Sequence, residues 1–164
     1  MKVQKRRRRE NKTDYLKRLE MLKSEKPRVV FRKTNKYIIA QYIKSEEAKD
    51  KVIITIDSKK LLKYGWPKEF SGSLKSLSAS YLTGYLIGKQ IKAKKLETPI
   101  VDIGMIQALH KTKVYAFIKG LIDSGVEIKC KEETFPEEDR IKGKHLKKDF
   151  SDKFNEIKSK IDKI

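Results

Sequence analysis

Five consecutive cations near the start of the chain carry the most distinctive chemistry in the sequence. Lys5 is followed directly by Arg6, Arg7, Arg8 and Arg9. A guanidinium group donates hydrogen bonds from a rigid fork that matches phosphate oxygens, and its flat face stacks on bases. A solvated protein surface normally mixes charges of both signs, and this run does not. The run therefore predicts contact with a nucleic acid.

A second group combines cations with amide and aromatic side chains. Its members are Arg28, Arg32, Lys33, Asn35, Lys36, Tyr37 and Gln41. Folded RNA is bound through phosphates, 2′-hydroxyls and stacking on unpaired bases, and these side chains supply such contacts. In a strand, alternation should place Arg28 and Arg32 on one face, with Val29 and Phe31 toward the core. The alternative is an ordinary hairpin with a basic exposed tip.

The residues alone leave two interpretations open for Trp66 and for a second basic loop. Trp66 lies between Gly65 and Pro67 in a polar loop, where it either stacks on a base or caps the edge of the core. A second basic loop contains Arg140, Lys142, Lys144 and His145. Because acidic residues 137–139 precede it, this loop also fits an ordinary surface of mixed charge.

The overall charge supports a polyanionic partner. The chain of 164 residues has 41 Lys and Arg against 22 Asp and Glu, a formal net charge of +19. Residues 1–44 contain 16 cations and 4 acids, so the first quarter carries most of the excess. Such self-repulsion disfavours a compact state unless an anion is bound. Nucleic acid is the expected anion.

Membrane and secreted classes are not favoured. The most apolar stretch, near residues 77–91, is interrupted by Ser, Thr and Gly, and no run reaches the ~20 apolar residues of a spanning helix. The basic N-terminus is not followed by the apolar segment of a secretion signal. A single cysteine, Cys130, cannot form an internal disulfide and suits a reducing cytoplasm.

The elements that position these groups follow from hydrophobic periodicity. We expect a basic N-terminal arm without fixed structure of its own and a short helix capped by Thr13 (1–26), an α/β RNA-binding domain (27–131), and a basic loop with a C-terminal helix (132–164). The expected strands are 29–31, 37–43, a central 52–56, 99–103 and 126–130. The expected helices are 74–94 and 114–124, the latter ended by Gly125, and one with Phe150, Phe154, Ile157, Ile161 and Ile164 on a stripe.

This order predicts an α/β fold in which an antiparallel hairpin sheet is extended by a β-α-β crossover, with helices packed on the sheet. Residues 45–51 are expected to form a charged turn between the second and third strands. Ser80, Gly84 and Gly88 recur every four residues, which indicates close packing of the long helix against the sheet. Tyr81 and Tyr85 fall on its apolar stripe and are expected in the core.

Several stretches form a recognisable set: Asp14-Tyr15 with Arg18-Leu19, Pro27 to Tyr37, Ala40-Gln41, Ser80 to Leu86, Asp102-Ile103-Gly104, Lys119 to Gly125 and Glu138 to His145. Together they resemble large-subunit ribosomal protein eighteen, and the last stretch resembles its archaeal and eukaryotic branch. The Asn usual before the long helix is absent around residues 71–76. The resemblance implies binding of 5S ribosomal RNA in the central protuberance, beside large-subunit ribosomal protein five and large-subunit ribosomal RNA. It adds Tyr15 and Arg18 to the RNA-contacting residues and favours RNA contact for the loop containing Arg140.

Two other functions share part of this pattern. A sheet of this order is similar to the ribonuclease H arrangement, in which clustered carboxylates hold Mg²⁺ at strand ends. Only Asp57 and Asp102 lie at the ends of expected strands, and the long helix contains no acidic residue. A free-standing RNA chaperone would share all the basic features. We therefore expect a non-catalytic protein of the cytoplasmic large ribosomal subunit, with no cofactor and no metal site.

Overall fold

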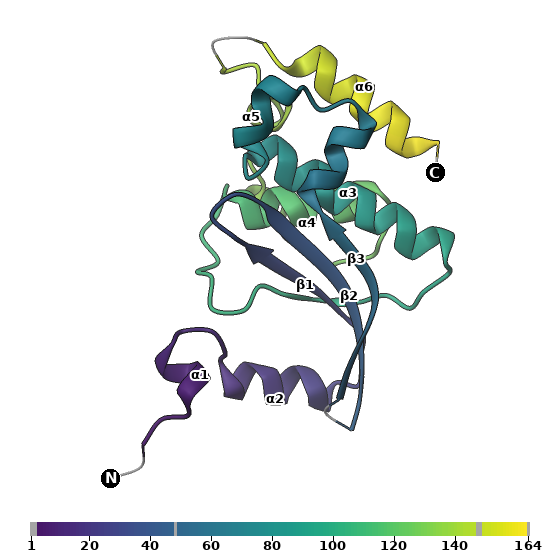
Figure 1. The fold of residues 1–164 in the computed structure, drawn as a ribbon. Coiled ribbons are helices and arrows are strands. Elements are labelled where there is room, and N and C mark those ends of the chain that lie inside the picture. The colour runs from purple at the N-terminus through teal and green to yellow at the C-terminus, as the bar shows by residue number, and fades with distance from the viewer. Residues whose placement is uncertain (1–2, 48, 147–148, 164) are drawn as a thin grey trace.

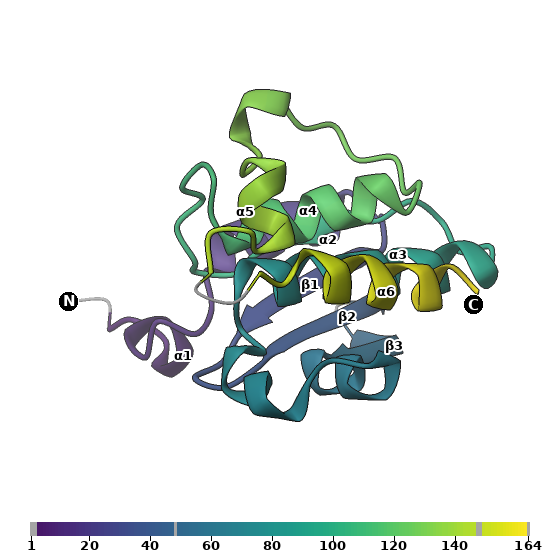
Figure 2. The same ribbon diagram turned by 90° about the horizontal axis from the view of Figure 1, so that it is seen from above.

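A single mixed sheet with helices on both sides forms the centre of the fold, as the computed structural model shows (Figure 1). The structure describes residues 3–47, 49–146 and 149–163. Helices α3 (Leu77–Ala93) and α4 (Lys113–Asp123) cover one face of the sheet, and α2 (Tyr15–Lys23) crosses the other side (Figures 1 and 2). This arrangement confirms the expected α/β class.

The strands are β1 (Arg28–Lys33), β2 (Ile38–Glu46), β3 (Lys49–Asp57) and β4 (Ile100–Asp102), in the order β3-β2-β1-β4. β1 pairs antiparallel with β2, which pairs antiparallel with β3. The chain then crosses over through α3, and β4 pairs parallel with β1, with Val30 opposite Asp102. The hairpin sheet extended by a crossover is therefore confirmed.

The prediction that the third strand is central is wrong, because β3 lies at an edge of the sheet. Its apolar run suggested burial on both faces. In the structure, Ile54 and Ile56 are buried, whereas Val52 is 47% exposed and Ile53 is only partly covered. Helix α3 packs on the face of this strand that carries Ile54 and Ile56.

The charged turn is also shorter than expected. Ser45 pairs with Asp50 and Glu46 with Lys49, so β2 and β3 extend almost to the tip. The Ser45 hydroxyl donates to Asp50 Oδ1 at 2.7 Å, and Glu46 faces a lysine of opposite charge across the hairpin. Cross-strand contacts of this kind stabilise pairing in a polar segment.

Helices α3 and α4 pack on each other through glycines. A Cβ at Gly84 would overlap the Phe117 carbonyl oxygen, and a Cβ at Gly120 would overlap the Tyr81 carbonyl oxygen. Ser80, Gly84 and Gly88 were expected to face the sheet, and this is wrong: Ser80 donates to Lys113 O, Gly84 faces Phe117, and Gly88 faces Ser124 at the end of α4. The close approach joins the two helices that carry the core, in which Tyr81 and Tyr85 are buried as predicted.

From α4 onward the observed elements agree with those expected from the sequence, except for one strand. Gly125 ends α4 with φ +93°, as predicted, and Val126 N donates to Leu121 O at 3.1 Å. Residues 126–130 do not form the expected strand; they pass β4 without a backbone hydrogen bond to it among the described residues. Short helical segments follow at η3 (Glu132–Thr134) and α5 (Glu138–Lys142).

The C-terminal helix α6 (Ser151–Asp162) buries the predicted stripe. Phe154, Ile157 and Ile161 lie in the core, as does Phe150 just before the helix. They pack near the 3-10 segments η1 (Ser58–Tyr64) and η2 (Lys68–Ser73), between which the loop with Trp66 lies. Ile164, the last expected member of the stripe, lies outside the described residues.

Candidate nucleic-acid interface

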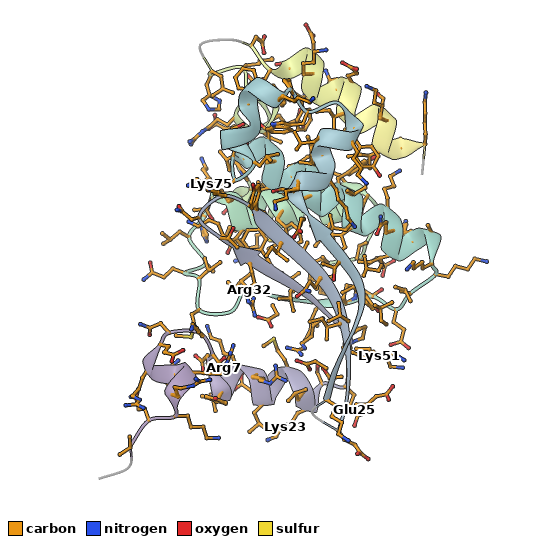
Figure 3. All side chains as sticks on the ribbon, in the orientation of Figure 1. Arg7, Lys23, Glu25, Arg32, Lys51 and Lys75 are labelled. Carbon is orange, nitrogen blue, oxygen red and sulfur yellow. The ribbon has the colours of Figure 1, made fainter. Side chains whose placement is uncertain are left out.

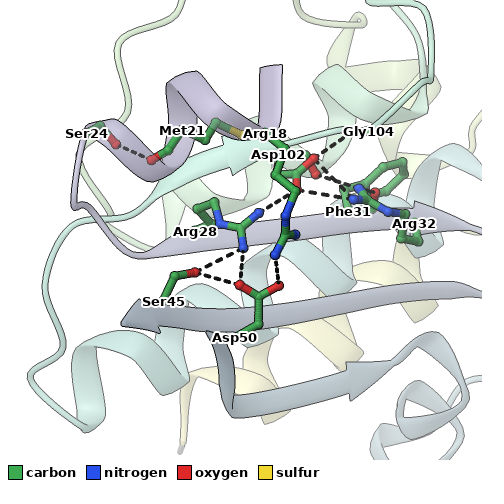
Figure 4. Close-up of polar contacts among 10 residues, drawn as sticks. All are labelled: Arg18, Met21, Ser24, Arg28, Phe31, Arg32, Ser45, Asp50, Asp102 and Gly104. Carbon is green, nitrogen blue, oxygen red and sulfur yellow. Dashed lines mark hydrogen bonds and ion pairs between the residues drawn. The ribbon is translucent and has the colours of Figure 1, made fainter. Parts of the chain in front are cut away.

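A chain of alternating charges connects α2 to the sheet, on the face opposite α3 and α4 (Figure 4). Arg18 of α2 lies 2.9 Å from Asp50 of β3, and Asp50 lies 2.8 Å from Arg28 of β1. Arg28 is 3.2 Å from Asp102 at the end of β4, and Asp102 also pairs with Arg32 at 3.2 Å. These five side chains therefore join one helix and three strands.

Arg28 was expected on the RNA-contacting face, but the structure places it inside. It is only 2% exposed, because α2 and the segment after β4 cover this end of the strand. Two carboxylates and the Ser45 hydroxyl surround its guanidinium, and its Nε is buried without a partner among the described residues. The alternation of side chains along the strand correctly predicted the sheet face on which Arg28 lies, but not that other segments bury it there. Its role is to hold the network together.

Arg32 is fixed in position but remains partly accessible, with 39% of its side chain exposed. Its Nη1 donates to the Phe31 carbonyl at 2.8 Å and to the Asp102 carbonyl at 3.0 Å. Its Nη2 donates to both carboxylate oxygens of Asp102 at 3.2 Å. Gly104, with φ +65°, leaves room for this guanidinium, since a Cβ there would lie 3.0 Å from it. The Arg32 guanidinium is therefore held in a fixed orientation without a ligand.

The pKa of the Asp50 carboxyl shows that its contacts in this network favour the ionised form of the residue. Burial alone raises the pKa of the Asp50 carboxyl. The hydrogen bonds from Ser45 and Arg18 and the charges of Arg28 and Arg18 outweigh burial and lower this pKa below its ordinary value. Asp50 is therefore a stable anion that holds Arg18 of α2 against the sheet.

A cleft of about 400 Å³ lies between α2 with its preceding segment and the end of the sheet. Its cationic lining residues are Arg7, Lys12, Lys17, Arg18, Arg28 and Arg32. The acidic ones are Asp14, Glu20 and Asp102. Arg7 and Arg32 face this space from opposite sides (Figure 3). Cations therefore outnumber acids around the cleft by six to three.

The basic arm is more ordered than the sequence predicted. Residues Arg6–Arg9 form one helical turn, α1, in which Glu10 N donates to Arg6 O at 3.0 Å. Arg7 Nε donates to the Thr13 hydroxyl at 2.9 Å, and Arg8 lies 3.3 Å from Asp14. These contacts hold the turn against the start of α2.

Asp14, and not the expected Thr13, caps α2. Its Oδ1 accepts from Leu16 N at 3.1 Å and from Lys17 N at 3.4 Å. Ahead of the helix, Lys5 Nζ lies 4.6 Å from the centre of the exposed Tyr15 ring. Lys5, Arg6 and Arg9 are exposed.

At the tip of the β1–β2 hairpin, Lys33, Asn35 and Lys36 are exposed. Tyr37 is partly buried, and Lys59 Nζ lies 4.3 Å from the centre of its ring. Further along β2, the Gln41 amide donates to the Thr55 hydroxyl at 3.3 Å. The structure thus brings the tip residues together but places Gln41 away from them, on the middle of the strand pair.

Trp66 is not available for a base. It is 3% exposed, its ring centroid is 4.8 Å from that of Phe150, and its Nε1 donates to Phe70 O at 3.0 Å. Of the two interpretations that the sequence left open, the core position is the one observed. The cause is α6, which brings Phe150 under the loop.

The second basic loop has mixed charge in the structure. Lys142 lies 2.9 Å from Glu138, and Lys144 lies 2.8 Å from Asp139. Arg140 and His145 are exposed. Arg140 lies instead beside a separate pocket that also contains Lys33. The loop therefore does not join the cleft beside α2.

Three residues of these sites were not singled out from the sequence: Asp50, which orients arginines, and Lys12 and Lys17, which line the cleft. Asp102 was noted only as a carboxylate at a strand end, and its contacts with Arg28 and Arg32 were not predicted. Single acids and lysines in a Lys-rich chain have no local signature. Only their partners distinguish them, and these are supplied by the tertiary fold.

Neither a metal site nor a membrane span is visible in the described part of the chain. Its residues contain no cluster of three or more His, Cys, Asp or Glu that could hold a metal ion. No helix formed by these residues is both long and apolar enough to cross a membrane.

Comparison with known proteins gives consistent matches. A family model described as ribosomal large subunit proteins 60S L5 and 50S L18 matches residues 1–99. The large ribosomal subunit protein uL18 of Korarchaeum cryptofilum is 47% identical over 155 residues, which cover 94% of this chain and 77% of that protein. The uL18 protein of Methanoregula boonei is 36% identical over 159 residues, covering 97% and 88%. That of Methanothermobacter thermautotrophicus is 40% identical over 141 residues, covering 86% and 71%.

Proposed function

The chain belongs to this family of large-subunit ribosomal proteins, and from that premise we propose that it binds 5S ribosomal RNA and helps attach it to the central protuberance of the large subunit. A member of the family is a constituent of the ribosome and not an enzyme. The proposal adds the identity of the RNA and the place of attachment.

The observation that supports RNA binding most directly is the distribution of unpaired cations. Arg7 and Lys17 line the cleft beside α2, and Lys33 and Lys36 stand at the hairpin tip. In the part of the chain that the structure describes, none of the four lies within 4.0 Å of a carboxylate. Phosphate groups are the natural counter-charges for such a surface.

The proposed selectivity for a folded RNA rests on the groups beside these cations. The hairpin tip adds the Asn35 amide and the Tyr37 ring, and Arg32 offers a pre-oriented guanidinium at the cleft. A surface for duplex phosphates alone needs only point charges, whereas loops and bulges are recognised through amides, rings and flat guanidinium groups. We place large-subunit ribosomal RNA and ribosomal protein five among the neighbouring partners.

Crosslinking in assembled large subunits tests this proposal. Photoreactive groups introduced at Lys36 and at Lys17 should both crosslink to nucleotides of 5S ribosomal RNA. Lys63, an exposed lysine on η1, serves as the control position. Crosslinks from Lys36 and Lys17 that map only to other RNA, or only to proteins, would contradict the proposal. Release from subunits in high salt would instead favour a free-standing RNA chaperone.

A further inference from the structure

A second pocket, separate from the cleft beside α2, lies at the hairpin end of the sheet. It has a volume of about 470 Å³ and is bordered by β1, the start of α3, α5, the segment 106–112 and the start of α4. Lys33, Lys111, Lys113 and Arg140 supply its cations. Lys75, labelled in Figure 3, stands at the same end of the molecule.

Lys111 has an acidic partner, Glu137 at 3.8 Å, whereas the other cations at this pocket lack one among the described residues. In the described chain, no carboxylate lies within 4.0 Å of Lys33, Lys75, Lys113 or Arg140. Burial, followed by repulsion from Lys33 and Lys75, lowers the pKa of the Lys113 amine. Like charges held together in this way destabilise the free protein, so the cluster is better explained by an anion that binds there.

The floor of the pocket is apolar. Leu77 and Ile106 are partly buried, Val114 is buried, and Leu109 is 60% exposed at the rim. The exposed Gln107 side chain adds an amide beside them. An apolar floor with one amide and a cationic rim suits a flat polar ring attached to a phosphate.

The segment that carries this floor is anchored. The Thr112 hydroxyl donates to Leu109 O at 2.7 Å, and Lys111 N donates to Thr134 O at 2.8 Å. The His110 ring packs edge-on against Tyr115, with centroids 5.7 Å apart. The pocket is therefore formed without a ligand, which lowers the entropic cost of binding.

We infer that this pocket binds one unpaired nucleotide of the ribosomal RNA, with the base against Ile106 on the floor and Leu109 at the rim, and the phosphate between Lys33 and Lys113. The inference rests on the proposed function and adds a nucleotide-binding site to it. A paired base cannot enter, because its Watson–Crick edge and both faces are occupied inside a duplex. The pocket thus distinguishes looped or bulged RNA from a plain double helix.

The experiment measures binding to three RNAs: 5S ribosomal RNA, an unpaired octanucleotide and a plain duplex. Leu109→Ser should weaken binding of the first two by about fivefold to tenfold and leave duplex binding unchanged. Lys113→Met should weaken binding of the first two and lower their salt slope by about 0.7–0.9, the loss of one phosphate contact. Leu62→Ser and Lys63→Met, at exposed positions on η1, are the matched controls.

The melting temperature of the free protein distinguishes an RNA-binding role of Lys113 from a structural role. Because Lys113 lies among like charges, Lys113→Met should raise the melting temperature of the free protein while it weakens RNA binding. A fall in melting temperature would show that the lysine is structural, and this would overturn the inference. So would unchanged octanucleotide binding by both variants, or equal losses for duplex and octanucleotide.

The two proposals fail in different ways. If the unmodified protein does not prefer 5S ribosomal RNA, the proposed function fails, while the octanucleotide still reports on the pocket. If the protein prefers 5S ribosomal RNA but neither variant changes binding, only the nucleotide pocket is refuted.

Discussion

Arg32 binds Asp102 through both the side chain and the backbone: its guanidinium lies 3.2 Å from each carboxylate oxygen and 3.0 Å from the carbonyl oxygen. The parallel pairing of β1 with β4 places Asp102 opposite Val30, and so within reach of this arginine. The contact connects the crossover strand to the hairpin that carries the basic tip. It also fixes the direction of one guanidinium in the proposed RNA-binding cleft.

Asp102→Asn should destabilise the protein by about 3–5 kcal/mol, because it leaves the buried Arg28 without a full counter-charge. The nearly buried carboxylate also accepts from Gly104 N at 2.8 Å. Asp50→Asn should cost less, about 1–2 kcal/mol, since Asp50 is more exposed and its contacts are better solvated. Urea unfolding of both variants measures the difference. Equal costs, or a loss below about 1 kcal/mol for Asp102→Asn, would refute the assigned role of Asp102.

Acid should selectively remove the contribution of Asp50. Because the folded protein lowers the pKa of this carboxyl below its ordinary value of about 3.9, its stabilising contribution is fully present above that value. It is lost as the pH falls through the lower folded pKa. The stability difference between the unmodified protein and Asp50→Asn should therefore be constant near neutrality and shrink below about pH 4. A difference that grows on acidification would contradict the assigned network.

Gly84→Ala should cost at least about 2 kcal/mol, because the added methyl would collide with the backbone of α4. Gly120→Ala should behave in the same way from the opposite helix. Gly72→Ala is the control, since its Cβ would meet nothing within 4 Å, and it should change stability by less than about 0.5 kcal/mol. Thermal unfolding compares the three. Similar melting temperatures for Gly84→Ala and Gly72→Ala would disprove the close helix approach.

Local sequence patterns predicted the secondary structure better than they predicted the tertiary environment of individual residues. The alternation of Val29 and Phe31, the stop at Gly125 and the stripe of α6 depend on neighbouring residues, and the structure confirms each. The burial of Arg28 was missed because its partners Asp50 and Asp102 are 22 and 74 residues away.

The same limit explains the strand errors. The apolar run of β3 did not reveal that the strand lies at an edge, since this depends on which other strands pair with it. Residues 126–130 have a suitable alternation, with Val126 buried, but they do not pair with β4 in the described structure. A β-strand needs a neighbouring strand for its backbone hydrogen bonds, and the sequence of residues 126–130 does not show whether one is within reach.

Deleting residues 1–12 should separate binding from stability. Residues 3–12, the described part of the arm, bury no side chain, and the contacts that Arg7 and Arg8 make are at the surface. The melting temperature should therefore fall by less than about 4 °C, equivalent to about 1 kcal/mol. The salt slope for RNA binding should fall by about 2–4, because several phosphate contacts are lost. An unchanged slope would show that the arm is solvated surface, and a drop of about ten degrees would show that it is structural.

Competition between RNAs tests the central claim most directly. Purified protein bound to labelled 5S ribosomal RNA is titrated, at about 0.2 M salt, with unlabelled 5S ribosomal RNA or with a duplex RNA of equal length. At this salt concentration generic phosphate contacts are weakened and contacts specific to the folded RNA remain. We expect 5S ribosomal RNA to compete at least about tenfold more strongly than the duplex. Equal competition by the two RNAs would contradict the proposed recognition of 5S ribosomal RNA.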